Sequence, residues 1–296
     1  MSRIDEALRR AATTEGVPEP ATSTIDSSML GRYAIEAPAR VRDNSQHAAE
    51  PTPRGLQAEA PIRAIAPALA SKLVLSPDIS PRTHEQYRRL AAALHDLQAQ
   101  HGLKSLMVTS AAPSEGKTLT VVNIALTLSE SYHQRVLLID LDLRRPSIHD
   151  VLGIPNEAGI TDVVGTGGPM PVVQMSRRLS VVTAGRRLDK PLALLTSDRL
   201  RAMIADAGAH YDWVLLDTPP IGFLPDAQLV ARLSEAALFV IAAGVTPYAV
   251  VQRAIAELGP ERVVGTVLNR VEDRMLKSHD SYSGYYGAYA EKASTR

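Results

Sequence analysis

Short runs of consecutive apolar residues alternate with amphipathic segments through most of the chain. The runs expected to form strands are 105–109, 135–139, 179–183, 213–216, 237–243 and 263–268. The segments expected to form helices lie near 83–100, 117–132, 192–208, 225–235 and 247–258. Because several strand segments are apolar at consecutive positions, both of their faces are expected to be buried, as in a parallel sheet covered by helices on both sides. The pattern therefore predicts one doubly wound, mostly parallel α/β domain over residues 81–275.

The segments on either side of this domain have a different pattern. Residues 1–12 predict a short amphipathic helix, which is either a frayed terminal helix or a docking helix for a partner. Residues 13–80 hold eight of the chain's 20 prolines and predict a flexible linker, with a short ordered piece around Leu73–Leu75. Residues 276–296 predict a flexible tail. Four of the nine tyrosines lie in this tail: Tyr282, Tyr285, Tyr286 and Tyr289.

The composition is that of a soluble globular protein, with 45% hydrophobic and 22% charged residues. The 32 basic residues balance the 32 acidic residues, so the net charge gives no reason to expect nucleic acid as a partner. The absence of cysteine excludes disulfides and thiolate metal sites and fits a cytoplasmic protein. The N-terminus has no apolar core of the signal-peptide type, and no stretch approaches the roughly 18 apolar residues of a membrane-spanning helix.

The segment TSAAPSEGKT is the strongest motif in the chain. It follows an expected strand and opens an expected helix, as does the phosphate-binding pattern Gly-x-x-x-x-Gly-Lys-Ser/Thr, here with Ala111 at the first position. Gly116 lets the backbone approach phosphate oxygens, and the loop N–H groups with the helix N-terminus form an anion cradle. Lys117 is expected to reach the β- and γ-phosphates, and the Thr118 hydroxyl to hold Mg²⁺. The expected nucleotide contacts are Ala111, Ala112, Pro113, Ser114, Glu115, Gly116, Lys117, Thr118 and Thr120.

Two further strands end in aspartates. In VLLIDLDLRRP the strand ends in Asp140 and Asp142, which on an extended strand would point to the same side and toward the phosphates. In DWVLLDTPP the strand ends in Asp217, the expected Walker B acid. Because Mg²⁺ prefers oxygen ligands, Thr118, Asp142 and Asp217 are the expected metal ligands. The alternative is that these aspartates only cap turns, which explains one aspartate better than a pair.

Taken together, these motifs resemble those of the bacterial tyrosine kinases of capsular and exopolysaccharide biosynthesis, the BY-kinase family. LLIDLDLR fits the family's second acidic motif and VLLDTPP its Walker B motif, and PLALLTSDRLRAMI and GTVLNRV resemble other family segments. The resemblance covers roughly residues 81–290 and is completed by the tyrosine-rich tail. It implies a P-loop NTPase fold of the deviant Walker, MinD-like type. It also implies an ATP-dependent protein-tyrosine kinase that phosphorylates its own C-terminal tyrosines.

The resemblance assigns roles to single residues. Lys117 and Asp140 would be catalytic, with Asp140 as the base that takes the proton of a tyrosine hydroxyl, because a pKa near 10 keeps that hydroxyl protonated at neutral pH. Asp142 and Asp217 would organise Mg²⁺ beside ATP, and Asn269 would lie near the adenine. The four tail tyrosines would be the phosphorylation sites.

The resemblance also implies partners. The family's subunits join into a ring through a Glu-x-x-Arg-x-x-Arg helix; this chain has Glu85 and Arg88, with Ala91 in place of the last arginine. Phosphorylation in trans within a homo-oligomer is expected nonetheless. The lack of a spanning segment implies a separate membrane-spanning activator of the chain-length-determinant type, and hence a cytoplasmic protein that associates peripherally with the membrane through this partner. A cognate tyrosine phosphatase is expected as well.

Two alternatives stay open at this point. A MinD/ParA-like switch ATPase of the same superfamily typically carries an extra lysine early in the phosphate loop, where this chain has Ala112, Pro113 and Ser114. A non-catalytic nucleotide-binding regulator would need nearly the same site residues and would use the tail as a docking peptide. Arg144 and Arg145 fit either a charge-stabilising role or a solvated turn. Asp140 and the tail tyrosines are the features that distinguish a kinase from such a regulator, and a tyrosine-rich tail is also not typical of the switch ATPases.

Overall fold

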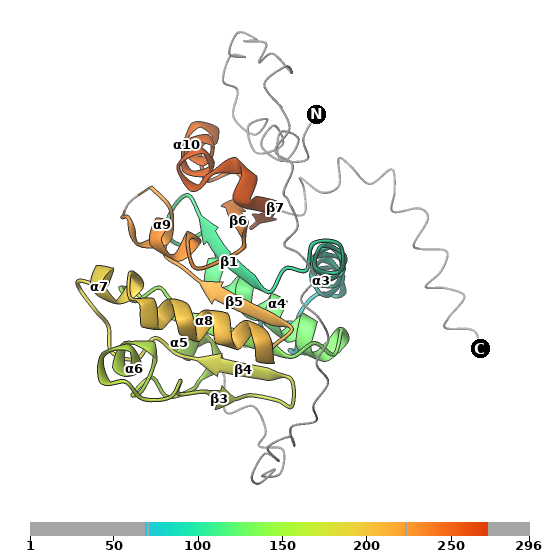
Figure 1. The fold of residues 1–296 in the computed structure, drawn as a ribbon. Helices are drawn as coiled ribbons and strands as arrows, with labels where there is room; N and C mark the ends of the chain where they lie inside the picture. The colour runs from blue at the N-terminus through green and yellow to red at the C-terminus, as the bar shows by residue number, and fades with distance from the viewer. Residues whose placement is uncertain (1–68, 70, 223, 272–296) are drawn as a thin grey trace, which may run out of the picture. The chain divides into compact units, whose positions relative to one another are not determined.

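Strands of consecutive apolar residues line up in a seven-stranded sheet with the spatial order β3-β4-β2-β5-β1-β6-β7 (Figure 1). The strands are β1 (Ser105–Ser110), β2 (Val136–Asp140), β3 (Val173–Gln174), β4 (Leu179–Val182), β5 (Trp213–Asp217), β6 (Ala236–Ala242) and β7 (Val263–Asn269). Neighbouring strands pair in parallel, apart from β3, which runs antiparallel to β4 at one edge. The computed structural model describes residues 69, 71–222 and 224–271. The predicted mostly parallel α/β fold is confirmed.

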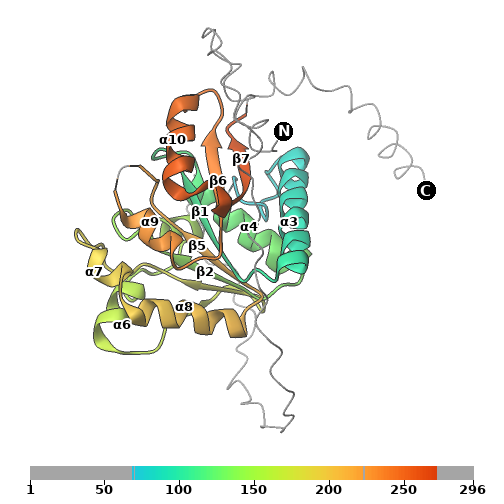
Figure 2. The same cartoon turned by 45° about the horizontal axis from the view of Figure 1, so that its top comes forward.

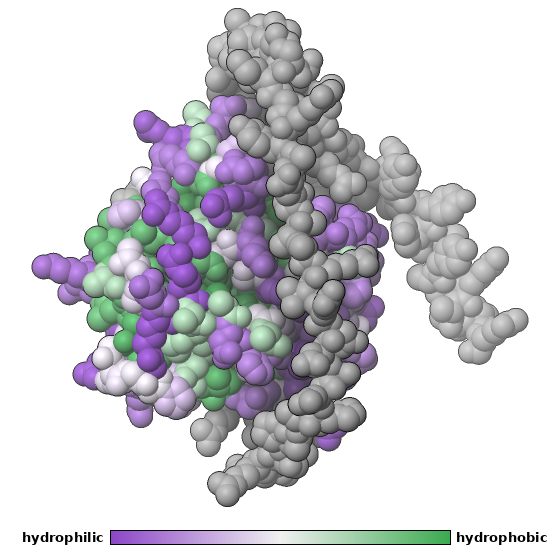
Figure 3. All heavy atoms as spheres, in the orientation of Figure 1, coloured by the Kyte–Doolittle hydropathy of each residue, from purple (hydrophilic) through white to green (hydrophobic). Residues whose placement is uncertain are grey.

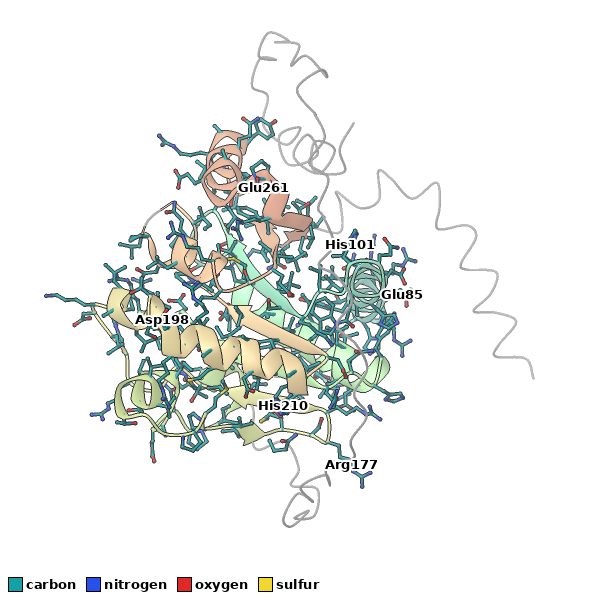
Figure 4. The ribbon with its side chains drawn as sticks, in the orientation of Figure 1. Glu85, His101, Arg177, Asp198, His210 and Glu261 are labelled. Atoms are coloured by element: carbon teal, nitrogen blue, oxygen red, sulfur yellow. The ribbon has the colours of Figure 1, made fainter. Side chains whose placement is uncertain are left out.

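Helices cover both faces of the sheet (Figure 2). One face carries α3 (Pro81–His101), α4 (Lys117–Ser131) and α5 (Ile148–Leu152). The other face carries α6 (Ile160–Thr166), α7 (Leu192–Leu195), α8 (Asp198–His210), α9 (Asp226–Ala231) and α10 (Tyr248–Leu258). A short 3₁₀ turn, η2 (Pro260–Arg262), leads into β7. In Figure 4, Glu85 and His101 mark α3 on the first side, and Asp198 and His210 mark the two ends of α8 on the second.

The alternation of side chains along each strand builds two cores, one under each helical layer. On β5, Trp213 and Leu215 pack with the core of α3, α4 and α5, whereas Val214 and Leu216 pack with the core on the other face. All four side chains are fully buried. A strand that is buried on both faces has no polar side, which explains the unbroken apolar runs in the sequence.

The last part of the predicted linker packs onto the domain. Leu73 and Val74 are buried in the same core as α4. The Val74 N–H donates to Asn123 Oδ1 at 2.8 Å, and Asn123 Nδ2 donates to the Lys72 carbonyl at 3.0 Å. Ser80 then caps the start of α3 with its hydroxyl. The linker therefore ends before these residues, because the ordered piece expected here continues into α3.

Several elements differ from the expected ones because their sequences are short. The pattern does not predict α5, α6 or β3, which have five, seven and two residues, too few for a period to be visible. The expected helix over 192–208 is two helices, because the Ser197 side chain caps α8 by accepting from the Leu200 N–H. The predicted helix over 1–12 and the predicted tail over 276–296 lie outside the described residues.

Hydrophilic side chains cover much of the face seen in Figure 3, with smaller hydrophobic areas between them. The exposed large apolar side chains of the described residues come from several elements: Leu75, Val172, Leu192, Leu224, Val245, Val250 and Val264. In this part of the chain, no helix combines the length and the apolar character needed to cross a membrane.

Candidate active site

The three sequence motifs meet at one edge of the sheet because their strands are neighbours. β5 lies between β1 and β2. Asp140, the last residue of β2, is paired in register with Asp217, the last residue of β5. The phosphate loop follows β1 at the same, carboxyl-terminal edge (Figure 1). Ligands of open parallel sheets bind at this edge.

The phosphate loop has the backbone shape of an anion site. Ser114 and Gly116 have positive φ angles of 63° and 95°, and α4 begins at Lys117, so the free N–H groups of its first turn adjoin the loop. A side chain is not tolerated at Gly116, because a Cβ there would lie 2.0 Å from Asn269 Nδ2. Asn269, expected near the adenine, lies against this loop and donates to the Glu115 carbonyl at 2.8 Å.

Thr118 and Asp217 form the part of the site that fits a divalent cation. The Thr118 hydroxyl donates to Asp217 Oδ2 at 2.6 Å. The other oxygen, Oδ1, is buried and has no hydrogen-bond partner among the described residues. This unpartnered carboxylate oxygen suits Mg²⁺, which takes few protein ligands and keeps several waters. The described residues contain no group of three acidic, histidine or cysteine side chains that could hold a metal, so phosphates and waters would have to complete the shell.

Asp140 and Asp142 do not share one orientation. β2 ends at Asp140, so Asp142 lies in the following loop, and its N–H donates back to Asp140 Oδ1 at 3.1 Å. Asp140 has no exposed surface, and its Oδ2 accepts from the N–H groups of Ser147 and Ile148 at 3.0 and 3.1 Å. The structure differs from the expected extended pair because β2 stops at Asp140, so the two side chains do not lie on one strand. Asp142 is partly exposed, whereas Asp140 holds the start of α5.

Burial raises the pKa of all three aspartates. Burial and the nearby charge of Asp217 raise the pKa of Asp140 well above its usual range. Burial raises the pKa of Asp217 to about 7, although the charge of Lys117 and the Thr118 hydroxyl act in the opposite direction. Burial also raises the pKa of Asp142, again against the charge of Lys117. A cation bound at Asp217 would favour the ionised form of this carboxyl group and so offset the cost of burying its charge.

Ser147 is a site residue that the sequence analysis does not identify. Its hydroxyl lies 2.9 Å from the Thr118 hydroxyl. Because Thr118 gives its proton to Asp217, Ser147 has to be the donor in this second bond. The Ser147 N–H also binds Asp140, so this residue connects the aspartate at the end of β2 with Thr118 and, through it, with Asp217 at the end of β5. The sequence around Ser147 indicates only a helix N-cap, because a serine follows Pro146 and precedes a helix.

Arg144 has a defined partner, whereas Arg145 is exposed. The Arg144 guanidinium donates to both carboxylate oxygens of the buried Asp226 at 2.5 and 3.3 Å. It also donates to the Asp189 carbonyl at 2.7 Å. Arg144 therefore fixes the loop after β2 to the start of α9, which is neither of the two roles expected for it.

Thr120, an expected nucleotide contact, lies on the side of α4 that faces α3. It is buried beside the Tyr87 hydroxyl: burial raises the pKa of Tyr87, and the side chains of Asn123 and Thr120 lower it. The Thr120 side chain therefore lies close to Tyr87 of α3, and its expected contact with the nucleotide stays a prediction.

The expected subunit-contact motif lies on α3. Glu85 and Arg89 form an ion pair at 3.2 Å, and Arg88 is exposed. Ala91, which stands in place of the family's second arginine, is fully buried against the domain. Two charged positions of the motif thus lie on the outer surface, and the third position faces inward.

The chain is similar in sequence to several tyrosine-protein kinases. A scan against protein-family models found no match. The chain is 34% identical over 208 residues to the tyrosine-protein kinase YwqD of Bacillus subtilis, which covers 69% of this chain and 86% of that protein. It is 30% identical over 208 residues to the putative tyrosine-protein kinase CapB of Staphylococcus aureus, covering 69% of this chain and 90% of that protein. It is 33% identical over 207 residues to the tyrosine-protein kinase wzc of Salmonella typhimurium, covering 68% of this chain and 28% of that longer protein.

Solved structures support the fold. The kinase domain of Escherichia coli tyrosine kinase ETK matches with a TM-score of 0.59 and 29% identity, over 64% of this chain and 77% of that chain. The VpsO kinase domain matches with a TM-score of 0.57 and 30% identity, over 64% and 98%. The chimerical protein CapA2B2 matches with a TM-score of 0.64 and 23% identity, over 69% and 91%. With 34% identity to a kinase of which it spans 86%, the chain belongs to the bacterial tyrosine-protein kinase family.

Proposed function

We propose that the chain is an autokinase that uses Mg²⁺ and ATP and phosphorylates its own tail in trans. This phosphorylation would regulate the synthesis and export of capsule or exopolysaccharide. The proposed acceptors are Tyr282, Tyr285, Tyr286 and Tyr289. One observation carries the proposal: Thr118 and Asp217 meet beside the phosphate loop and the buried Lys117, and one Asp217 oxygen is left without a partner among the described residues. Membership in a kinase family supports the use of ATP at this site.

Each part of the site has a role in this proposal. The free N–H groups of the loop and of the first turn of α4 would hold the phosphates, and Lys117 would balance the charge on the β- and γ-phosphates. Thr118, Asp142 and Asp217 would hold Mg²⁺, which neutralises phosphate charge when bound. Asn269 packs on the loop and would lie beside the nucleotide.

The transfer step forms a bond between a tyrosine oxygen and the γ-phosphorus. The bond between this phosphorus and the bridging oxygen breaks, and that oxygen leaves on ADP. The phenol proton goes to Asp140, whose burial raises its pKa and so makes its carboxylate a stronger proton acceptor than an exposed aspartate. Because Asp140 has no exposed surface and its oxygens bind the N–H groups of Asp142, Ser147 and Ile148, the loop over 141–147 has to move before a tyrosine can approach.

The proposal includes three partners: a second copy of the chain, a membrane-spanning activator of the chain-length-determinant type, and a cognate tyrosine phosphatase. The outer surface of α3, with Glu85 and Arg88, supports the contact between copies. Because Ala91 faces inward, this contact would use fewer charged groups than the family motif provides.

The test is a set of reactions of the full-length chain with Mg·ATP, analysed by phosphotyrosine detection and mass spectrometry. Wild type should gain phosphate between Tyr282 and Tyr289, and neither Lys117→Met nor a chain truncated at Arg274 should do so. A mixture of Lys117→Met with the tail-less chain should place phosphate on the Lys117→Met tail if transfer is in trans. ATP hydrolysis without phosphotyrosine, even with a membrane activator present, would overturn the autokinase proposal in favour of a switch ATPase.

A further inference from the structure

Glu115 places a carboxylate inside a loop that is expected to bind phosphates. A negative charge pointing at the phosphates would repel them. Glu115 stands between Ser114 and Gly116, which both have positive φ angles. Its side chain is directed into the protein, because only 2% of the residue's surface is exposed. The carboxylate therefore serves another purpose than contact with the ligand.

Three donors bind this carboxylate. Oε2 accepts from the Ala112 N–H, within the loop, at 2.6 Å. Oε1 accepts from the N–H of Ala242, the last residue of β6, at 3.1 Å, and also from the Thr246 hydroxyl. Thr246 belongs to the connection between β6 and α10, in which Val245 is 67% exposed. One buried side chain thus ties the phosphate loop to a strand end and to a surface connection.

The backbone of the same loop is held from the end of β7. Asn269 Nδ2 donates to the Glu115 carbonyl at 2.8 Å, and Arg270 Nη2 donates to the Ser114 carbonyl at 2.6 Å. A left-handed backbone is unfavourable for serine, so the shape of the loop at Ser114 has to be maintained by such contacts. Among these contacts, the Glu115 carboxylate is the one that reaches the β6–α10 connection.

We propose that Glu115 is a positioning residue for ATP, which fixes the phosphate loop and couples ATP affinity to the β6–α10 connection over residues 243–247. It acts through the N–H groups of Ala112 and Ala242 and the hydroxyl of Thr246, and it does not touch the phosphates. A ligand or partner that moves Thr246 would therefore change ATP affinity from outside the site. The inference rests on the proposed ATP-binding role of the loop, but not on the tail as the substrate.

The main variant is Glu115→Gln, which keeps the size of the side chain. The amide nitrogen would face a backbone N–H at Ala112 or at Ala242, so one buried N–H loses its acceptor. The dissociation constant for Mg·ADP, measured by calorimetry on the full-length chain, should rise about tenfold. The KM for ATP should rise by a similar factor, while kcat changes much less. Thr246→Val removes one of the three bonds and should raise the dissociation constant about threefold.

Two matched controls separate positioning from general stability. Glu235 also accepts two backbone N–H groups, those of Lys104 and Ser105 at 2.5 and 2.8 Å, but at the opposite end of β1. Both N–H groups bind the same oxygen, Oε2, so Glu235→Gln can keep both bonds through its amide oxygen and should leave Mg·ADP affinity close to that of wild type. Thr196→Val is the control for Thr246→Val, because the Thr196 hydroxyl donates to a backbone carbonyl on the α7 side of the molecule.

Each outcome decides the inference. If Glu115→Gln lowers the melting temperature but leaves the Mg·ADP dissociation constant within about twofold of wild type, as Glu235→Gln should, Glu115 is only structural and the inference is overturned. If Thr246→Val behaves like Thr196→Val, the coupling to the β6–α10 connection is overturned. If Glu115→Gln does not fold, the comparison of the two threonine variants decides alone. If wild type itself binds no Mg·ADP, the proposed function fails first and the inference fails with it.

Discussion

The two sides of the candidate nucleotide site differ in how completely their polar groups are satisfied. On the side of β6 and β7, both oxygens of Glu115 have donors, and the loop carbonyls accept from Asn269 and Arg270. On the side of β2 and β5, one buried oxygen of Asp217 has no partner among the described residues, and burial raises the pKa of Asp140 and Asp217. Buried polar groups normally find partners, so the second side carries a free-energy cost that a bound cation would offset.

This difference separates stability from function within one site. The loop side is already in a defined shape, so a substitution there should lower stability and nucleotide affinity together. The acidic side holds charge that destabilises the free chain, so a substitution there should raise stability while it removes activity. Substitutions on both sides test this division, and Lys117 lies between the two sides.

Lys117→Met should have the largest effect. The Lys117 charge lowers the pKa of Asp142 and of Asp217, so it acts on the acidic side as well as on the phosphates. We expect phosphotyrosine formation to fall by roughly 10³-fold or more, because the charge on the transferring phosphoryl group is no longer balanced. The Asp217 pKa should also rise above about 7, which NMR titration of the carboxyl group would detect. Lys190→Met, at an exposed position, is the control, and equal activity of the two variants would contradict the assignment.

Asp140→Asn tests whether the buried aspartate serves the chemistry or only the start of α5. The asparagine keeps one oxygen acceptor but cannot take a proton. If Asp140 is the base, single-turnover transfer from bound ATP should fall by at least about 100-fold, while Mg·ADP binding changes little. Asp150→Asn, an exposed position on α5, should leave transfer unchanged. If Asp140→Asn still transfers phosphate as wild type does, another group has to be the base. Asp140 then serves only to bind the N–H groups of Ser147 and Ile148.

Asp217→Asn should make the free chain more stable at high pH. The pKa of Asp217 is raised to about 7 in the folded chain, whereas an aspartate in the unfolded chain titrates near 3.9. The folded state therefore holds this proton more tightly, and the contribution of Asp217 to stability falls as the pH rises from about 4 to about 7. At pH 8 the substitution should stabilise the chain by roughly 1–3 kcal/mol in denaturant unfolding, with a much smaller effect at pH 5.

The same variant should lose Mg²⁺-dependent transfer, because the unpartnered oxygen of Asp217 is replaced or lost as a ligand. For wild type, Mg·ADP affinity should increase as the pH rises through about 7, since the carboxyl group has to release its proton to bind a cation. If Asp217→Asn is less stable than wild type at pH 8, the buried charge of Asp217 does not destabilise the folded chain.

The fold, the phosphate loop and the Walker B aspartate can be predicted from local sequence patterns. The phosphate-loop motif between a strand and a helix identifies Lys117 and Thr118, and an apolar strand that ends in an aspartate identifies Asp217. The roles of Ser147 and Glu115 depend on partners 29 and 131 residues away, so no local pattern predicts them. The geometry of the acidic pair differs from the expected one because β2 ends at Asp140 and the Asp142 N–H donates back to that aspartate.

Ser147→Ala should have the smallest effect and gives the finest test of the acidic side. It removes the hydroxyl that donates to Thr118 but leaves the N–H that binds Asp140, so α5 should stay in place. We expect the apparent affinity for Mg²⁺, measured from ADP binding at a series of Mg²⁺ concentrations, to fall about three- to tenfold, because a partner that orients a ligand has been lost. Ser147→Thr should restore it. Ser129→Ala, which removes a buried hydroxyl bonded within α4, is the control. If both alanine variants keep wild-type Mg²⁺ dependence, Ser147 only begins a helix, and the cation site consists of Thr118 and the carboxylates alone.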